Sequence, residues 1–149
     1  MKLSEEVKRY IRDTEFTPIA TAGKEGVHLV STWGGYGRDG YLFIVDDEHV
    51  AWPASEYFKT EENIKAGSQV QLLVALREEH NGYRIEGRAT FLSQGEVFQR
   101  IKRRFAWARA AVLLEVQKYE KLLAEESAAG YLASHPEVRT PSGSAIWPE

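Results

Sequence analysis

The sequence predicts a mainly β protein with flanking helices, built as a six-stranded antiparallel barrel. Six short segments alternate apolar and polar residues or form short apolar runs, whereas only three or four segments have helical periodicity. Hairpins outnumber strand–helix–strand crossovers, which favours an antiparallel barrel over a doubly wound parallel sheet. A six-stranded barrel has little interior space, so we expect any ligand to bind in a groove outside it.

Composition excludes several classes of site. The 149 residues, 43% hydrophobic and 28% charged, suit one domain with a modest core. The absence of cysteine excludes disulfides, iron–sulfur clusters and thiolate zinc sites, and the four histidines have no metal-ligand spacing. A net charge of −3 disfavours nucleic acid as the main partner. Without the apolar run of a signal peptide or membrane span, we expect a cytoplasmic protein that does not contact a membrane.

The N-terminal part contains a helix and a hairpin. Ser4, followed by two glutamates and by apolar residues at helical spacing, is expected to cap a helix that runs to about Asp13. Strand-like segments at residues 18–22 and 27–33 then form a hairpin across a glycine-containing turn.

The middle of the chain contains a strand, a loop and a helix. Residues 41–45 form a continuous apolar run, typical of a strand buried on both faces, and residues 46–58 are expected to form a loop. The helix that follows has Thr60 either as its N-cap or as a donor to a ligand oxygen, and Gly67 as its C′ residue.

A second hairpin follows this helix. Residues 69–76 alternate in polarity, as do residues 83–92, and the dipeptide Asn81-Gly82 between them is typical of a type I′ turn.

The last elements are two helices and a strand. Ser93 and Glu96 form a capping box for an amphipathic helix to about Trp107. A strand at about residues 111–117, a helical stretch from 120 to 133 and a polar tail complete the chain.

The segment FKTEENIKAG, residues 58–67, has the features of a phosphate site. Lys59 supplies a charge, Thr60 supplies a hydroxyl, and the first N–H groups of a helix point outward at the positive end of its dipole. A capped surface helix without a ligand explains the same residues equally well.

The segment VSTWGGY, residues 30–36, suits a planar ring. Ser31 and Thr32 could hydrogen-bond a heteroaromatic edge, while Trp33 and Tyr36 could flank the ring, although ordinary packing also explains each residue. No catalytic triad, carboxylate pair or GxGxxG turn is present, so redox chemistry would require a bound cofactor.

Four blocks in the order GVHLVSTWGGY, FKTEENIKAG, YRIEGRATF and FAWARAAVLLEV resemble the FMN-binding split barrels of the pyridoxamine 5'-phosphate oxidase-like superfamily. Within it, the region from about Ile19 to Leu122 is similar to small dimeric FMN-binding proteins of sulfate-reducing bacteria. The resemblance implies a split-barrel domain over residues 1–122, a homodimer, and one non-covalent FMN per subunit at the subunit interface. It assigns no role to the helical extension and tail, residues 123–149.

The resemblance also implies roles for individual residues. Lys59 and Thr60 would bind the FMN phosphate, and Trp107 would cover the flavin of the other subunit. The small FMN-binding proteins that the chain resembles have Asn at the position of Ser31 and glycines at those of Ser55 and Glu56, so hydrogen bonds at the ring edge, and with them the flavin potential, would differ here. The candidate cofactor-binding residues are Ser31, Thr32, Trp33, Tyr36, Pro53, Ala54, Ser55, Lys59, Thr60 and Trp107.

We therefore expect an FMN flavoprotein that passes electrons, either as a carrier with a redox partner or as a reductase using NAD(P)H. Pyridoxamine 5'-phosphate oxidation is not expected, because the tail TPSGSAIWPE lacks the basic and histidine motifs that hold that substrate. Two alternatives remain. One is a non-catalytic protein that holds FMN or haem, with His28, His49 and His80 as conceivable haem contacts, and the other is an apo dimer.

Overall fold

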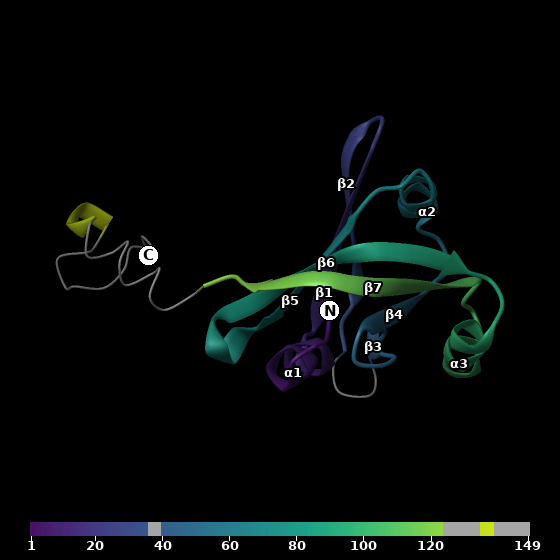
Figure 1. The fold of residues 1–149 in the computed structure, drawn as a ribbon, viewed down its shortest axis with the longest axis horizontal. Coiled ribbons are helices and arrows are strands. Elements are labelled where there is room, and N and C mark those ends of the chain that lie inside the picture. Colours follow the sequence, from purple (N-terminus) through teal and green to yellow (C-terminus); the bar gives the residue numbers. More distant parts are fainter. Residues whose placement is uncertain (36–39, 124–134, 139–149) are drawn as a thin grey trace.

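The computed structural model describes residues 1–35, 40–123 and 135–138. In these residues a single antiparallel sheet of seven strands, in the order β2-β1-β5-β6-β7-β4-β3, curls into a half-barrel with three α-helices around it (Figure 1). The predicted fold class is thus confirmed. None of the described helices has the length and apolar character needed to span a bilayer.

The helical elements are α1 (Glu5–Asp13), α2 (Phe58–Lys65), α3 (Glu96–Arg104) and the 3-10 turns η1 (Arg77–Glu79) and η2 (Pro136–Val138). The strands are β1 (Phe16–Gly23), β2 (Gly26–Trp33), β3 (Phe43–Ile44), β4 (His49–Ala54), β5 (Val70–Leu76), β6 (Asn81–Leu92) and β7 (Ala110–Lys121).

The main core forms where α1 packs against the sheet. The Ser4 hydroxyl accepts a hydrogen bond from the Val7 N–H at 3.2 Å, so the predicted cap is confirmed. Val7, Tyr10 and Ile11, at helical spacing, are fully buried in one cluster with apolar residues of β1, β4, β5, β6 and β7.

β4 lies where we expected a loop, residues 46–58, and it raises the strand count from six to seven. The sequence did not predict this strand because it contains Pro53, and proline has no N–H to donate to a neighbouring strand. β3 pairs with β4 only opposite Ala51 and Val50, so the missing N–H of Pro53 costs no ladder bond on that side. The strand buried on both faces is β4. β3, expected to be such a strand over residues 41–45, is a half-buried two-residue edge strand.

The predicted turn at Asn81-Gly82 is wrong. Both residues lie inside β6, opposite Leu76 and Ala75, and η1 with His80 makes the connection. His80 takes the left-handed conformation, with φ of 49°. The Asn81 side chain instead accepts from the Leu123 N–H at 3.0 Å, so it holds the end of β7 rather than a turn.

The boundaries of α3 and β7 also differ from the prediction. Gly95, with φ of 97°, is the N-cap of α3 and no side chain caps the helix, so the Ser93–Glu96 capping box does not form. α3 ends at Arg104 rather than near Trp107. β7 continues to Lys121, which replaces the start of the helix expected from residue 120. The remainder of that expected helix lies outside the described residues.

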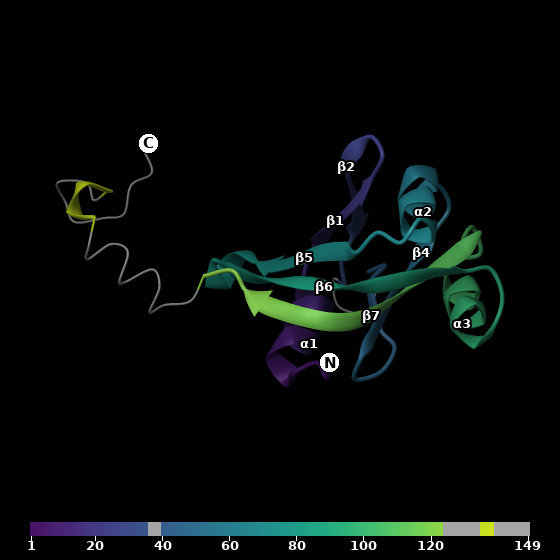
Figure 2. The ribbon, with the colours of Figure 1, turned by 45° about the horizontal axis from the view of Figure 1, so that its top comes forward.

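The β1–β2 hairpin and α2 lie side by side in both views of the ribbon (Figures 1 and 2). A Cβ on Gly23 would lie 2.1 Å from the Asn63 side-chain oxygen, and the Asn63 amide donates to the Thr21 hydroxyl at 3.1 Å. Gly67 ends α2 as predicted. It has φ of 98° and donates to Ile64, while Ser68 donates to the Asn63 carbonyl. α2 is therefore fixed to the hairpin at its buried face and closed at its C-terminus.

Candidate functional site

A cavity of about 740 Å³ opens between β2, the loop from β4 to α2, and Trp107. Its volume lies within the range of small-molecule sites, roughly 300–1,000 Å³. The predicted site residues that line it are Ser31, Thr32, Trp33, Pro53, Ser55, Lys59 and Trp107. The structure thus brings together residues that are more than 70 positions apart in the chain.

Two of the predicted residues that the structure describes, Ala54 and Thr60, do not line the cavity. Ala54 is fully buried in the core, and its carbonyl accepts from the Arg109 N–H at 3.0 Å. Thr60 is buried in the first turn of α2. Tyr36 lies outside the described residues. Among the lining residues, the Ser31 hydroxyl donates to the Thr17 carbonyl at 3.1 Å, so it is already used within the hairpin.

The glycines after Trp33 serve the fold rather than a ligand. A Cβ on Gly35 would lie 2.0 Å from the Ile11 carbonyl, and one on Gly34 would lie 2.4 Å from the Thr14 carbonyl. The chain therefore crosses closely over the end of α1, a contact that only glycine permits.

The N-terminus of α2 has an unusual backbone. Tyr57, not Thr60, is the N-cap, and it takes the left-handed conformation with φ of 59° and no side-chain capping bond. A left-handed residue followed by helical residues aims successive N–H groups into one concavity, which binds anions. The Tyr57 hydroxyl donates to the Ser31 carbonyl at 2.9 Å, so this strained residue is held against β2.

Arg109, which was not predicted from the sequence, anchors the loop before α2 through hydrogen bonds to its carbonyl groups. Its guanidinium donates to the Ser55 carbonyl at 2.8 Å and to the Glu56 carbonyl at 2.7 Å. It also pairs with Glu61 at 2.9 Å and lies 4.4 Å from the centre of the Phe58 ring. Because the C=O and N–H of a trans peptide point in opposite directions, both peptide N–H groups face away from Arg109. The only sequence signal for Arg109 was its place in the FAWARAA block.

Two buried hydroxyls near this turn have no partner. Thr32 and Thr60 are 4% and 1% exposed, and neither Oγ1 has a hydrogen bond among the described residues. Thr32 lines the cavity, and Thr60 lies one helical turn before Asn63 on the buried face of α2. Thr17, directly opposite Thr32 in the hairpin, has the same defect but does not line the cavity. Buried polar atoms without a partner are rare, so the Thr32 hydroxyl, which belongs to a lining residue, fits a ligand with oxygen or nitrogen atoms at its edge.

Lys59, the cavity's lysine, is already paired with carboxylates. Its ammonium group lies 3.2 Å from Glu62, one turn along α2, and 3.2 Å from Glu25 in the turn of the β1–β2 hairpin. Hydrogen bonds to Glu62 and to Glu25 raise the pKa of Lys59. An anion that reaches Lys59 therefore competes with both carboxylates.

Part of the lining of the cavity is aromatic. The Trp107 ring lies 5.7 Å from that of Tyr41 and 5.5 Å from that of Phe105, and Trp107 remains 49% exposed. In the single chain Trp107 lines its own cavity, so its implied contact with the flavin of a second subunit stays a prediction.

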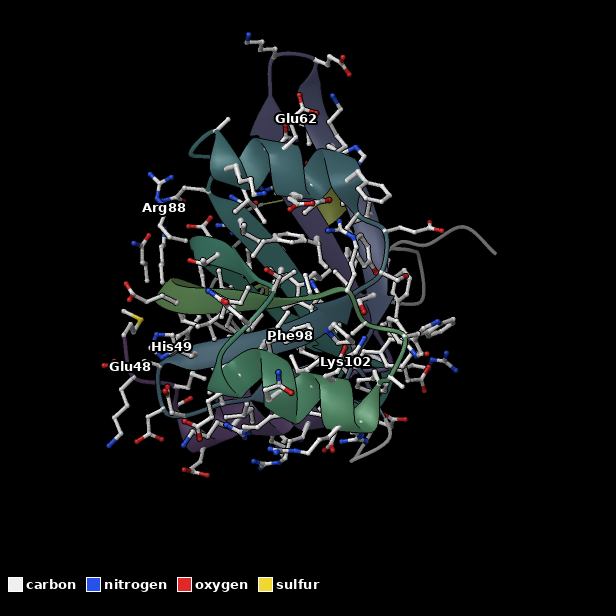
Figure 3. All side chains as sticks on the ribbon, turned by 90° about the vertical axis from the view of Figure 1, so that its right-hand side faces the viewer. Glu48, His49, Glu62, Arg88, Phe98 and Lys102 are labelled. Carbon is white, nitrogen blue, oxygen red and sulfur yellow. The ribbon has the colours of Figure 1, made fainter. Side chains whose placement is uncertain are left out.

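The histidines are dispersed. His28 lines the cavity, whereas the His49 ring is bonded to Asp46 at 2.9 Å at the far end of β4 (Figure 3), and His80 lies in the β5–β6 connection. Within the described part of the chain, no three His, Asp or Glu side chains converge to form a metal site.

Some known proteins are similar to this chain in sequence, and others are similar to it in fold. An FMN-binding protein of Nitratidesulfovibrio vulgaris (strain DSM 19637 / Miyazaki F) is 34% identical over 111 residues, covering 70% of this chain and 86% of that protein. The structure of HupZ from Group A Streptococcus superposes with a TM-score of 0.69 at 18% identity, over 80% of this chain and 94% of that one. An FMN-binding protein of Syntrophomonas wolfei superposes with a TM-score of 0.62 at 18% identity, over 80% and 88%.

The two structural similarities show the fold alone. The sequence, however, matches the family described as pyridoxamine 5'-phosphate oxidase over residues 3–128, which include every described strand and all three α-helices. The chain belongs to the pyridoxamine 5'-phosphate oxidase family.

Proposed function

We propose that the protein binds FMN in the 740 Å³ cavity, with the phosphate at the N-terminus of α2. The observation that carries this proposal is that three features lie in this cavity or next to it. These are the Lys59 ammonium, the outward N–H groups from Tyr57 onward, and the unpartnered hydroxyls of Thr32 and Thr60. The relative that is 34% identical, itself called an FMN-binding protein, supports the same reading.

The rest of the cavity suits the isoalloxazine ring. Trp33 and Trp107 are exposed aromatic residues of its lining, and Pro53 and Ser55 line it too. Bound FMN would supply electron-transfer chemistry, while the chain fixes the ring's position and sets its polar surroundings. We place the protein's function in electron transfer, as a carrier or as a flavin-dependent reductase.

We also propose that the protein is a homodimer that joins through one face of the β1–β2 hairpin. Phe16, Val27, Leu29 and Trp33 share this face by register and are 53%, 79%, 67% and 64% exposed. An exposed apolar patch beside a ligand cavity is typical of a protein interface. Burial of this face would bring a second subunit next to the ring, which agrees with FMN at the interface.

The phosphate assignment is tested by Lys59→Ala. We expect FMN affinity to fall ~10–100-fold, the loss of a charge-assisted hydrogen bond, while riboflavin affinity stays within about twofold. Lys24→Ala, which removes an equal charge from the hairpin turn, is the matched control. Flavin fluorescence titration measures both ligands. An equal loss for FMN and riboflavin would show that Lys59 does not read the phosphate.

A second experiment separates a reductase from a carrier. The FMN-loaded protein is mixed anaerobically with NADH or NADPH and the visible flavin band is followed. A reductase that uses nicotinamide bleaches this band, whereas a carrier requires another reduced partner. Failure of both nucleotides would reject the nicotinamide-driven reductase.

A further inference from the structure

We propose that Glu25 and Glu62 act as built-in counter-ions of Lys59 and thereby weaken the preference of the site for phosphorylated over unphosphorylated flavin. This inference rests on the proposed function. It concerns three residues, Glu25, Lys59 and Glu62, which we call the Lys59 triad. The family resemblance assigns neither Glu25 nor Glu62 to FMN binding.

The triad joins two elements that are distant in sequence. Glu25 lies in the two-residue turn of the β1–β2 hairpin, and Glu62 lies on α2 just below that turn (Figure 3). Each carboxylate lies 3.2 Å from the Lys59 ammonium, so both contacts are direct ion pairs. The Lys59 side chain is 35% exposed, whereas those of Glu25 and Glu62 are 80% and 69% exposed. Solvent can therefore reach both carboxylates when another anion replaces them.

The charges of the triad oppose a phosphate. One ammonium and two carboxylates leave a net charge of −1 at the place where a phosphate of about −1.5 to −2 would bind. A phosphate that contacts Lys59 must displace at least one carboxylate and then remain within a few ångströms of the displaced group. Riboflavin, which has no phosphate, meets neither cost. The two carboxylates of the triad therefore lower affinity for FMN selectively.

The position of the hairpin does not depend on Glu25. Close packing of Gly23 on the Asn63 side chain and the 3.1 Å hydrogen bond from Asn63 to Thr21 fix the hairpin to α2. The change Glu25→Gln therefore removes the charge while the hairpin keeps its place. Glu62 is on the exposed side of α2, so Glu62→Gln also leaves the packing intact.

The test compares Glu25→Gln, Glu62→Gln and the double variant with the unaltered protein. Dissociation constants for FMN and riboflavin are measured by fluorescence titration at about 50 mM salt and again at about 500 mM salt. We expect each single variant to bind FMN ~3–10-fold more tightly and riboflavin within twofold of the parent, with the gain shrinking at high salt. The control is Glu78→Gln in η1, an equal change of charge that lies at the β5–β6 connection, away from α2 (Figure 1). It should change neither constant.

Two results would overturn the inference. FMN affinity that falls in Glu25→Gln would show that Glu25 supports the phosphate site, and equal gains for FMN and riboflavin would show that the triad does not act on the phosphate. A separate measurement distinguishes this from failure of the flavin proposal. Inorganic phosphate is titrated without flavin while the backbone amide signals of residues 57–60 are followed by NMR. Tighter phosphate binding in Glu25→Gln than in the parent supports the counter-ion role even if no flavin binds, and no difference refutes it.

Discussion

The buried hydroxyls of Thr32 and Thr60 form no hydrogen bond among the described residues, so they do not stabilise the fold. A buried hydroxyl without a partner costs about 1–3 kcal/mol relative to an apolar group of similar shape. Thr32 lines the cavity, and Thr60 lies in the first turn of α2, where we propose that the phosphate binds. At the scale of single residues, the proposed site would therefore trade stability of the free protein for hydrogen bonds to a ligand.

The variant Thr32→Val tests this trade. In the absence of flavin we expect its free energy of unfolding to rise by about 1 kcal/mol, because the unpartnered hydroxyl is removed. FMN affinity should fall ~3–10-fold, because the ligand loses a hydrogen bond. Denaturant melts and fluorescence titration measure the two effects.

The control for Thr32→Val is Thr17→Val, directly opposite in the hairpin. Thr17 has an unpartnered hydroxyl but does not line the cavity, so this variant should gain stability and leave FMN affinity unchanged. Unchanged FMN affinity in Thr32→Val would remove Thr32 from the site.

Among the elements, the entry to α2 depends on a distant strand. Arg109, directly before β7, contacts two carbonyls and a carboxylate of the segment that begins α2. Only a planar fork of donors satisfies these acceptors together, so we assign Arg109 to positioning the anion-binding N–H groups rather than to direct ligand contact.

The variant Arg109→Lys keeps the charge and removes the fork. We expect FMN affinity to drop ~10-fold and amide exchange of residues 56–60 to accelerate, because lysine cannot hold both carbonyls. Arg88→Lys is the control, since Arg88 donates to the Gly67 carbonyl at the opposite end of α2 (Figure 3). Full FMN affinity in Arg109→Lys would show that charge alone suffices.

The contact between α1 and β6 gives the fold a dependence on pH. The Tyr83 hydroxyl donates to the Glu6 carboxylate at 2.6 Å, and this bond lowers the pKa of Glu6. A carboxyl whose folded pKa is depressed adds stability above its unfolded pKa, near 4.3, and loses it as the pH falls through the folded value. Tyr83→Phe should therefore melt at a lower temperature than the parent at pH 7, and the difference should narrow below about pH 4. A difference that is constant from pH 7 to pH 3 would contradict this assignment.

Element types were more predictable than their ends. Ser4, the alternation of β5 and β6, and Gly67 each identified an element correctly, because one local pattern sufficed. β4 was missed because a proline argues against a strand. Pro53 is tolerated here because β3 does not extend opposite it, and that depends on tertiary pairing. Asn81-Gly82 has the composition of a turn, but tertiary pairing places both residues in β6, and the turn itself lies just before them.

The site was predictable to the extent that residues are close in sequence. Lys59 and Thr32 were found from local chemistry, and the structure places both on one cavity. Arg109 and Glu25 act from other elements and had no local signal. The role of Thr60 as N-cap was wrong, because the left-handed Tyr57 begins the helix one turn earlier than the sequence pattern suggests.

For the whole molecule, the exposed face of the β1–β2 hairpin is the proposed dimer face and lies beside the cavity. β2 is an edge strand of the sheet, one of its faces is apolar and solvent-exposed, and residues of both its faces line the cavity. A second subunit on the exposed face would therefore rigidify the strand that carries Thr32.

The variant Leu29→Glu tests this link. We expect a dimer in the parent and a monomer in the variant by analytical ultracentrifugation, because a charge is placed in the apolar patch. FMN affinity of the monomer should fall at least ~10-fold, since half of an interface site is lost. Leu123→Glu, at another exposed leucine beyond β7, should remain dimeric. A monomeric parent protein would refute the proposed assembly.

The most direct test of the central claim is a crystal structure of the protein grown with FMN. We predict one flavin per chain in the cavity between β2, Pro53 and Trp107, with phosphate oxygens within hydrogen-bonding distance of the Lys59 ammonium and the N–H groups that begin α2. Flavin density elsewhere, a phosphate turned away from Lys59, or a colourless protein that takes up no FMN would contradict the account.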